Sequence, residues 1–130
     1  MKRLLDTNAY AALKRGHEGV AGLVRQLSEL VFSIVVVGEL LFGFRNGGRY
    51  DRNTKELDEF LADARVRLLP VTRATADRFG RIATALRKTG KPIPSNDIWI
   101  AAHAFESGAE LVTFDDHFEA VAGLALVHLA

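Results

Sequence analysis

Leu4-Leu5-Asp6-Thr7-Asn8 is the stretch that decides the fold, because two leucines run directly into a carboxylate. We predict a short buried strand over residues 2–5, so Asp6 lies where that strand ends. In open α/β sheets, ligands bind in the crevice beyond the carboxyl ends of the strands. The stretch therefore predicts a binding site that begins at Asp6.

Three more acids, Glu39, Asp97 and Asp115, stand far from this stretch and from one another, so only the fold can bring them together. Asp115 follows another predicted strand, Asp97 lies in the first turn of a predicted helix, and Glu39 interrupts an apolar run. Clustered carboxylates resist ionising together, and a divalent cation reverses that cost. Hard oxygen ligands favour Mg²⁺ or Mn²⁺. We therefore predict that the four acids converge on such an ion.

Each acid taken alone also has a structural interpretation. Asp6 can cap a helix, and Asp97 can interact favourably with a helix dipole. One of the pair Asp115 and Asp116 can be a solvated turn residue. Glu39 is harder to explain in this way, because an unpaired buried carboxylate is costly. The combination of the four acids, rather than any one of them, favours a metal site.

Strands alternate with helices along the chain, which indicates an α/β fold with a central, mostly parallel sheet of about four to five short strands flanked by helices. The predicted strands cover residues 2–5, 32–36, 66–71, 110–114 and 124–129, and Pro70 suggests an edge position for the third. The predicted helices cover residues 9–14, 18–30, about 37–45, 49–65, 73–89 and 97–106, and residues 117–121 form at most one turn. The expected N-caps are Thr7 or Asn8, Thr72, and Ser95 or Asn96.

Composition bounds the class of protein. The 130 residues are 48% hydrophobic and 25% charged, as in a globular protein, most simply one domain over residues 1–130. The absence of cysteine excludes disulfides and thiolate metal sites. A net charge of +1 and a pI of about 8.1 are far from the basic footprint of a dedicated nucleic-acid binder. With no signal-peptide pattern and no apolar run near 20 residues, we expect a soluble, cytoplasmic protein.

Other chemistry fits the sequence poorly. There is no phosphate-binding glycine loop and no G-x-S-x-G nucleophile motif. A phosphoacceptor signalling domain needs an aspartate after the central strand, where this chain has Thr72, and an Asp-x-Asp phosphatase needs a second acid where it has Asn8. Trp99 is interpreted as a packing residue. The histidines have no ligand-like spacing and are interpreted as surface or structural residues: His17, His103, His117 and His128.

The four acids lie in motifs that resemble those of the PIN-domain nucleases, and within them the VapC-like toxins of toxin–antitoxin pairs. Residues 5–8 (LDTN) are similar to the first motif, residues 38–43 (GELLFG) to the second, and residues 93–102 (IPSNDIWIAA) to the third and most specific. Residues 113–118 (TFDDHF) match the fourth, Thr-x-Asp-x-x-Phe, whose spacing selects Asp115 rather than Asp116. The resemblance runs nearly end to end.

This resemblance implies an endoribonuclease that depends on Mg²⁺ or Mn²⁺ and hydrolyses RNA phosphodiester bonds with metal-activated water. The catalytic and metal-binding residues would be Asp6, Glu39, Asp97 and Asp115. The residues expected to support these acids by hydrogen bonds are Thr7, Asn8, Ser33, Asn96 and Thr113. A catalytically silent PIN-like module that binds RNA or a partner is the alternative.

The resemblance also implies a VapB-like antitoxin partner, and a homodimer or a hetero-oligomer with that antitoxin. Because the net charge offers no general attraction, RNA phosphates would be met by local basic clusters. Candidates are Arg45, Arg49, Arg52, Arg87, Lys88 and Lys91, for which solvated helix faces are the alternative interpretation. Leu41, Phe42 and Phe44 are expected in the core, with an antitoxin groove as the alternative.

Overall fold

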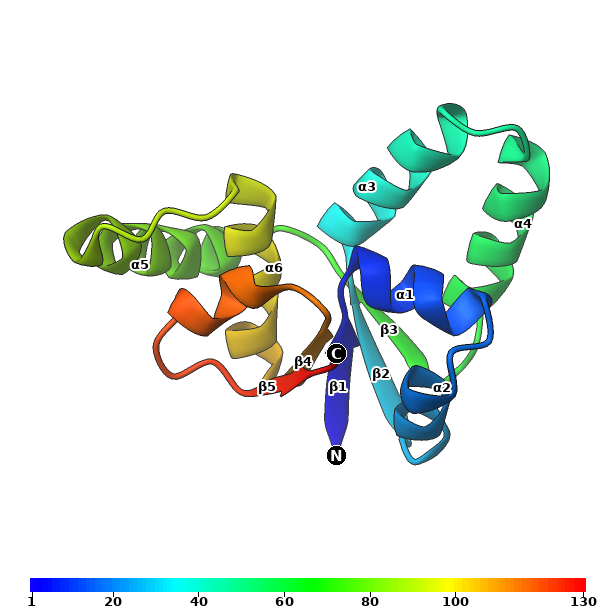
Figure 1. Cartoon of the computed structure of the whole chain (residues 1–130), viewed down its shortest axis with the longest axis horizontal. Coiled ribbons are helices and arrows are strands. Elements are labelled where there is room, and N and C mark those ends of the chain that lie inside the picture. The colour runs from blue at the N-terminus through cyan, green and yellow to red at the C-terminus, as the bar shows by residue number, and fades with distance from the viewer.

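A computed structural model describes all residues, 1–130. It contains five strands, six α-helices and one short 3₁₀ helix (Figure 1). In chain order these are β1 Lys2–Leu5, α1 Thr7–Lys14, α2 Glu18–Arg25, β2 Glu29–Ser33, α3 Ile34–Arg45, α4 Tyr50–Leu61, β3 Val66–Leu69, α5 Arg73–Thr89, α6 Ser95–Ser107, β4 Glu110–Thr113, η1 Asp116–Ala120 and β5 Leu126–His128.

The strands form a single sheet in the order β3-β2-β1-β4-β5, and every neighbouring pair is parallel. The predicted α/β fold with a parallel sheet is therefore confirmed, and so is the edge position of β3. The central strand is β1, whose Leu4 and Leu5 are fully buried. Strands buried on both faces read as continuous apolar runs, which is why this short stretch could be recognised in the sequence.

The register brings the carboxyl ends of the central strands together. Leu4 pairs with Val31 of β2 and with Leu111 of β4, and Leu5 pairs with Val112. The residues that follow these strands therefore emerge at one edge of the sheet. In Figure 1 the α3–α4 pair lies on one side of this edge and the α5–α6 pair on the other.

The prediction for residues 26–36 was wrong. The predicted helix over residues 18–30 ends at Arg25, and the predicted strand over residues 32–36 begins at Glu29 and ends at Ser33. The Ser33 side chain accepts a hydrogen bond from the Val35 backbone N–H at 3.1 Å and caps α3. The β-branched run after Ser33 is therefore helical, because burial of residues such as Val36 outweighs their preference for strands.

Other helix ends follow their local sequence more closely. Thr72 caps α5 as predicted, with reciprocal hydrogen bonds to Thr75. Gly90 and Gly108 end α5 and α6 with φ of 68° and 74°, a conformation that favours glycine. The predicted cap of α6 at Ser95 or Asn96 was wrong, since Pro94 occupies the cap position and makes no side-chain hydrogen bond.

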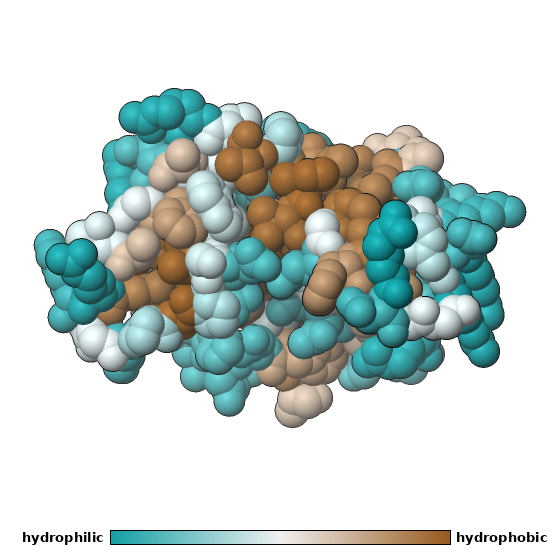
Figure 2. All heavy atoms as spheres, turned by 90° about the horizontal axis from the view of Figure 1, so that it is seen from above, coloured by the Kyte–Doolittle hydropathy of each residue, from teal (hydrophilic) through white to brown (hydrophobic).

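The face seen from above carries a broad hydrophobic area beside hydrophilic side chains (Figure 2). Phe42 on α3 is 73% exposed, so its expected place in the core was wrong. Leu41 and Phe44 are partly buried and pack against the core, and Trp99 packs on Phe79 with ring centroids 4.2 Å apart. None of the helices combines the length and the hydrophobicity that crossing a membrane requires.

Candidate active site

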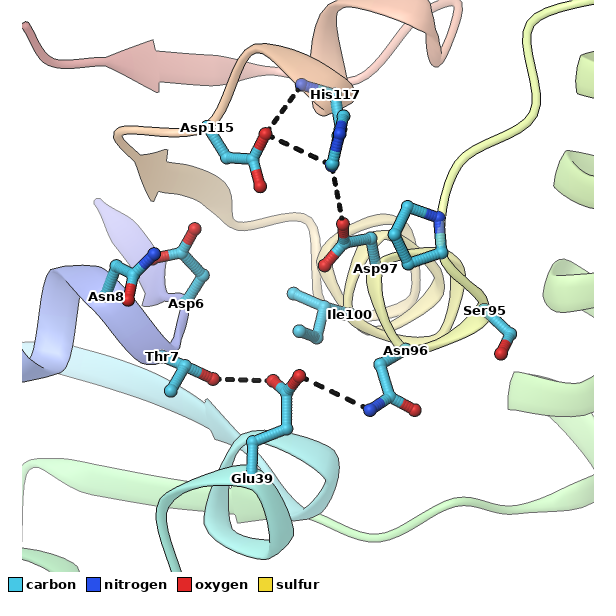
Figure 3. Close-up of a pocket in the computed structure, with 11 residues that line it drawn as sticks. Asp6, Thr7, Asn8, Glu39, Ser95, Asn96, Asp97, Ile100, Asp115 and His117 are labelled. Carbon is cyan, nitrogen blue, oxygen red and sulfur yellow. Dashed lines mark hydrogen bonds and ion pairs between the residues drawn. The ribbon is translucent and has the colours of Figure 1, made fainter. Parts of the chain in front are cut away.

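The four acids singled out in the sequence line one pocket of about 420 Å³ at the carboxyl edge of the sheet (Figure 3). They reach it from four different segments: the end of β1, α3, the first turn of α6, and the turn after β4. The remaining lining residues are Thr7, Asn8, Pro94, Ser95, Asn96, Ile100 and His117. The lining is thus almost entirely polar, with Ile100 at its base.

Asp6 is buried and both of its carboxylate oxygens are held. One oxygen accepts a hydrogen bond from the Ala9 backbone N–H at 2.8 Å, and the other accepts one from the Thr113 hydroxyl at 2.5 Å. The first bond makes Asp6 the N-cap of α1, so the predicted cap at Thr7 or Asn8 was wrong. Burial raises the pKa of the Asp6 carboxyl, and the two hydrogen bonds lower it. The nearby carboxylates of Asp97 and Asp115 raise the pKa of Asp6 further.

Glu39 lies on the face of α3 that looks into the pocket. Its Oε1 accepts a hydrogen bond from the Thr7 hydroxyl at 2.5 Å, and its Oε2 accepts one from the Asn96 side-chain amide at 3.3 Å. Two residues expected to support the acids therefore both act on Glu39 and link α3 to α1 and α6. This position explains why a charged residue stands within an apolar run, because the Glu39 carboxylate lies in the polar pocket and not in the core.

Asp97 and Asp115 face each other across the pocket, and His117 lies between them. The His117 Nδ1 is 3.2 Å from Asp97 Oδ2 and 3.2 Å from Asp115 Oδ1. Burial raises the pKa of Asp97, and the nearby Asp115 and Glu39 also raise it, while His117 lowers it. The two acids therefore share one neighbouring imidazole.

His117 is the functional candidate that sequence reasoning missed. Its backbone N–H donates to Asp115 Oδ1 at 2.9 Å, and this tight turn directs the ring back over the pocket. Ligand-like spacing between histidines gives no hint of such a contact, because the partners are carboxylates. The available signal was its position two residues after an acid at the end of a strand, where such turns are common.

Thr113 is fully buried beneath the acids and connects two of them. Its hydroxyl donates to Asp6 and accepts the backbone N–H of Asp115 at 2.9 Å. Asn8 lines the pocket as well. Ser33 does not line the pocket. Its hydroxyl lies in the protein interior, 2.8 Å from Nδ1 of the buried His103 on α6. Its expected contact with the acids is therefore absent.

The six basic residues proposed for RNA lie outside the pocket lining. Arg45, Arg49 and Arg52 surround the connection between α3 and α4, while Arg87, Lys88 and Lys91 surround the end of α5. These two segments lie on opposite sides of the molecule in Figure 1. Asp116 also lies outside it and meets His128, whose Nε2 is 3.1 Å from Asp116 Oδ1.

The donor chemistry of the pocket fits a hard divalent cation. Four carboxylates line this one pocket, and burial together with neighbouring carboxylates raises the pKa of Asp6 and of Asp97. His117 is the one side chain in the pocket lining that can carry a positive charge. Asp97, Asp115 and His117 offer ligand atoms that all lie within 4.8 Å of one another. A bound dication would remove the repulsion and keep the oxygens deprotonated.

Comparisons with known proteins agree with this architecture. Residues 3–124 match the family model of the PIN domain. Ribonuclease VapC2 of Haemophilus influenzae is 34% identical over 115 residues, which cover 87% of this chain and 86% of that protein. The solved VapBC2 of Rickettsia felis, bound to a DNA fragment from its promoter, aligns over all of both chains with 26% identity and a TM-score of 0.88. VapBC-5 of Mycobacterium tuberculosis, a member of a family of toxin–antitoxin systems, aligns over 98% of both chains with 25% identity and a TM-score of 0.72.

Proposed function

This chain belongs to the PIN-domain family and within it to the VapC ribonucleases, and we propose from that membership and from its pocket that it is a metal-dependent endoribonuclease toxin. The observation that carries the proposal is the convergence of four acids from four segments into one pocket. The fold places this pocket at the carboxyl edge of a parallel sheet, where α/β proteins bind their ligands.

The proposed metal is Mg²⁺ or Mn²⁺, which would be held by Asp6, Glu39, Asp97 and Asp115. When bound, such an ion lowers the pKa of water and neutralises the charge that develops on a scissile phosphate. Carboxylate oxygens are the ligands that both ions accept most readily.

The chain's own contribution is to hold these acids in place before RNA arrives. The Ala9 N–H and the Thr113 hydroxyl fix the two oxygens of Asp6. Thr7 and Asn96 each donate to a different oxygen of Glu39, which fixes the plane of that carboxylate. Preorganised ligands bind a metal without an added cost of ordering their side chains.

RNA would enter along the edge between the two basic groups described above. Single-stranded RNA is attracted mainly through its phosphates, so the arginine and lysine side chains on either side of the pocket would hold the RNA in position for cleavage. Because the net charge is only +1, these local groups must provide the attraction.

The proposed partner is a VapB-like antitoxin that blocks the site. The exposed Phe42 on α3 supports a partner surface beside the pocket, since Glu39 on the same helix lines the pocket wall. A contiguous apolar area such as the one in Figure 2 often marks a protein interface. The assembly would be a toxin homodimer or a hetero-oligomer with the antitoxin.

The proposal is tested by cleavage of a panel of structured and unstructured RNAs with and without Mg²⁺ or Mn²⁺. We expect cleavage by the wild-type protein that EDTA abolishes. Asp6→Asn should lower cleavage by at least about 100-fold, because even groups that only support metal ligands contribute 10–100-fold. Its circular dichroism should be unchanged, since asparagine also caps helices well.

Asp116→Asn is the matched control, because Asp116 neighbours Asp115 but lies outside the pocket. Its activity should equal that of the wild type. Full activity of Asp6→Asn would contradict the assigned role. Wild-type protein that binds RNA or antitoxin but cleaves no RNA with either metal would instead support the silent binding module.

A further inference from the structure

One ring nitrogen of His117 stands between two of the pocket acids, from two different segments of the chain (Figure 3). Asp97 comes from α6 and Asp115 from the turn after β4. The second oxygen of each carboxylate has no hydrogen-bond partner within the protein. A nitrogen and two carboxylates that can act as metal ligands are thus gathered at one point, with ligand atoms within 4.8 Å of one another.

His117 is the one histidine that lines this pocket. The other three are engaged elsewhere. His103 is fully buried, with its two ring nitrogens 2.8 Å from the Ser33 hydroxyl and 3.0 Å from the Pro70 carbonyl. His17 accepts the Val20 N–H and caps α2, and His128 meets Asp116 and Glu119 on the surface.

The position of His117 is set by the backbone rather than by chance contact of a long side chain. The hydrogen bond from its N–H to Asp115 Oδ1, at 2.9 Å, closes the turn in which Asp115 caps η1. Phe118, the next residue, is 1% exposed and anchors η1 in the core. The backbone is thus fixed on both sides of His117, and its half-exposed imidazole lies against Asp97 and Asp115.

We propose that His117 supplies a nitrogen ligand to the metal held by Asp97 and Asp115, so that this site prefers Mn²⁺ to Mg²⁺. The inference rests on the proposed function, because it takes the metal of that site as given. It adds a ligand that the four-acid arrangement lacks, and it assigns the metal.

The physical reason is the difference between the two ions. Mg²⁺ is a hard cation that keeps several of its waters and is bound through oxygen, so an imidazole adds little to its binding. Mn²⁺ also accepts carboxylates, and as the first member of the divalent transition-metal series it binds a nitrogen ligand more readily than Mg²⁺, although less tightly than the later metals of that series do. A site with two carboxylates and one imidazole should therefore bind Mn²⁺ more tightly than Mg²⁺, whereas a site made only of carboxylates binds the two ions with more similar affinity.

The test measures metal binding without RNA, using the full-length protein. Mn²⁺ and Mg²⁺ affinities are obtained by calorimetry, and electron paramagnetic resonance of bound Mn²⁺ reports nitrogen coupling from a ligand. The variants are His117→Gln, which retains a polar side chain without a ring nitrogen, and His117→Ala. The control is His128→Ala, which removes a histidine from the surface cluster with Asp116 and Glu119.

We expect nitrogen coupling in the wild type and in His128→Ala, and its loss in both His117 variants. Mn²⁺ affinity should fall by about tenfold or more in those variants, as for residues that tune metal sites. Mg²⁺ affinity should change much less, so the preference for Mn²⁺ shrinks.

Three results would overturn the inference. Wild-type Mn²⁺ that binds without nitrogen coupling would leave the proposed function standing and remove His117 as a ligand. Tighter metal binding in His117→Ala would show that the imidazole competes with the metal for the acids. If the wild type binds neither ion, the proposed function fails together with the inference.

Discussion

At the scale of single residues, Asp6 has two roles that the sequence presents as alternatives. One carboxylate oxygen caps α1 and the other is held by Thr113 at the floor of the pocket. The cap fixes the side chain at the strand end, so the same hydrogen bond that starts a helix also orients a candidate metal ligand. A structural explanation for an acid at such a position is therefore no argument against a functional one.

The raised pKa of Asp6 makes a prediction about stability without metal. An unfolded aspartate ionises near 3.8, whereas burial keeps Asp6 protonated to higher pH in the folded protein. Its contribution to stability is thus fully present below pH 3.8 and is lost as pH rises through the higher, folded value. In EDTA at pH 7, Asp6→Asn should therefore unfold at a higher temperature than the wild type, and the gap should close towards pH 3.

Thermal unfolding followed by circular dichroism across this pH range checks the prediction. Added Mn²⁺ should then stabilise the wild type and leave Asp6→Asn nearly unchanged, because binding to the folded state alone raises stability. An Asp6→Asn protein that is less stable than the wild type at every pH would mean that burying the ionised Asp6 carboxylate does not destabilise the metal-free protein.

Whether the sequence could predict that a residue belongs to the site depends on what orients its side chain. Asp6, Asp97 and Asp115 stand at strand ends or helix starts, so the parallel topology alone brings them to one edge. His117 is directed by a turn between its own N–H and Asp115, and Thr7 reaches Glu39 across 32 residues. Contacts of this kind depend on side-chain geometry that no local pattern encodes.

At the scale of elements, the boundary between β2 and α3 is a place where sequence patterns do not predict the structure. Residues 30–37 are apolar except for Ser33 and mostly β-branched, so neither periodicity nor propensity separates the strand from the helix. Ser33 settles the boundary by capping α3. The same hydroxyl meets His103 on α6, so one residue ends a strand, starts a helix and ties a second helix to both.

Ser33→Ala should therefore weaken the fold without weakening metal binding. The substitution removes an N-cap and leaves a buried ring nitrogen of His103 without its partner, which together cost about 2–4 kcal/mol. Urea denaturation measures the loss, and calorimetry should show wild-type Mn²⁺ affinity in the folded variant.

The opposite pattern would restore the role that the sequence suggested for Ser33. If Ser33→Ala lowered Mn²⁺ affinity tenfold or more and left the free energy of unfolding unchanged, Ser33 would support the acids rather than the packing of α6.

At the scale of the whole molecule, the parallel sheet brings the four acids together at one edge. The acids occupy the middle of the carboxyl edge, and the two basic groups lie on either side. The α/β fold with a parallel sheet follows from the alternation of apolar strands with helices, whereas the strand order β3-β2-β1-β4-β5 is known only from the structure. The width of the pocket and the spacing of the basic groups depend on helix packing, which the sequence alone did not reveal.

Reversing the charge of Arg45, Arg49 and Arg52 should weaken RNA binding and flatten its dependence on salt. Each lost phosphate contact lowers the slope of log affinity against log salt by about 0.7 for a single strand, so three contacts change it by about 2. Fluorescence anisotropy at several salt concentrations, with the catalytically impaired Asp6→Asn protein, measures this slope.

Arg25→Glu provides the control, because Arg25 ends α2 shortly before β2 begins and so lies towards the amino edge of the sheet. It should leave the slope unchanged. An unchanged slope in the triple variant would place the RNA path elsewhere, with Arg87, Lys88 and Lys91 as the next group to reverse.

The most direct test of the metal site is a crystal structure of the protein soaked in Mn²⁺, read from the anomalous scattering of the metal. We predict an anomalous peak inside the pocket, within coordination distance of oxygens from Asp6, Asp97 and Asp115. A peak confined to the surface cluster of Asp116, Glu119 and His128, or no peak at saturating Mn²⁺, would contradict the account.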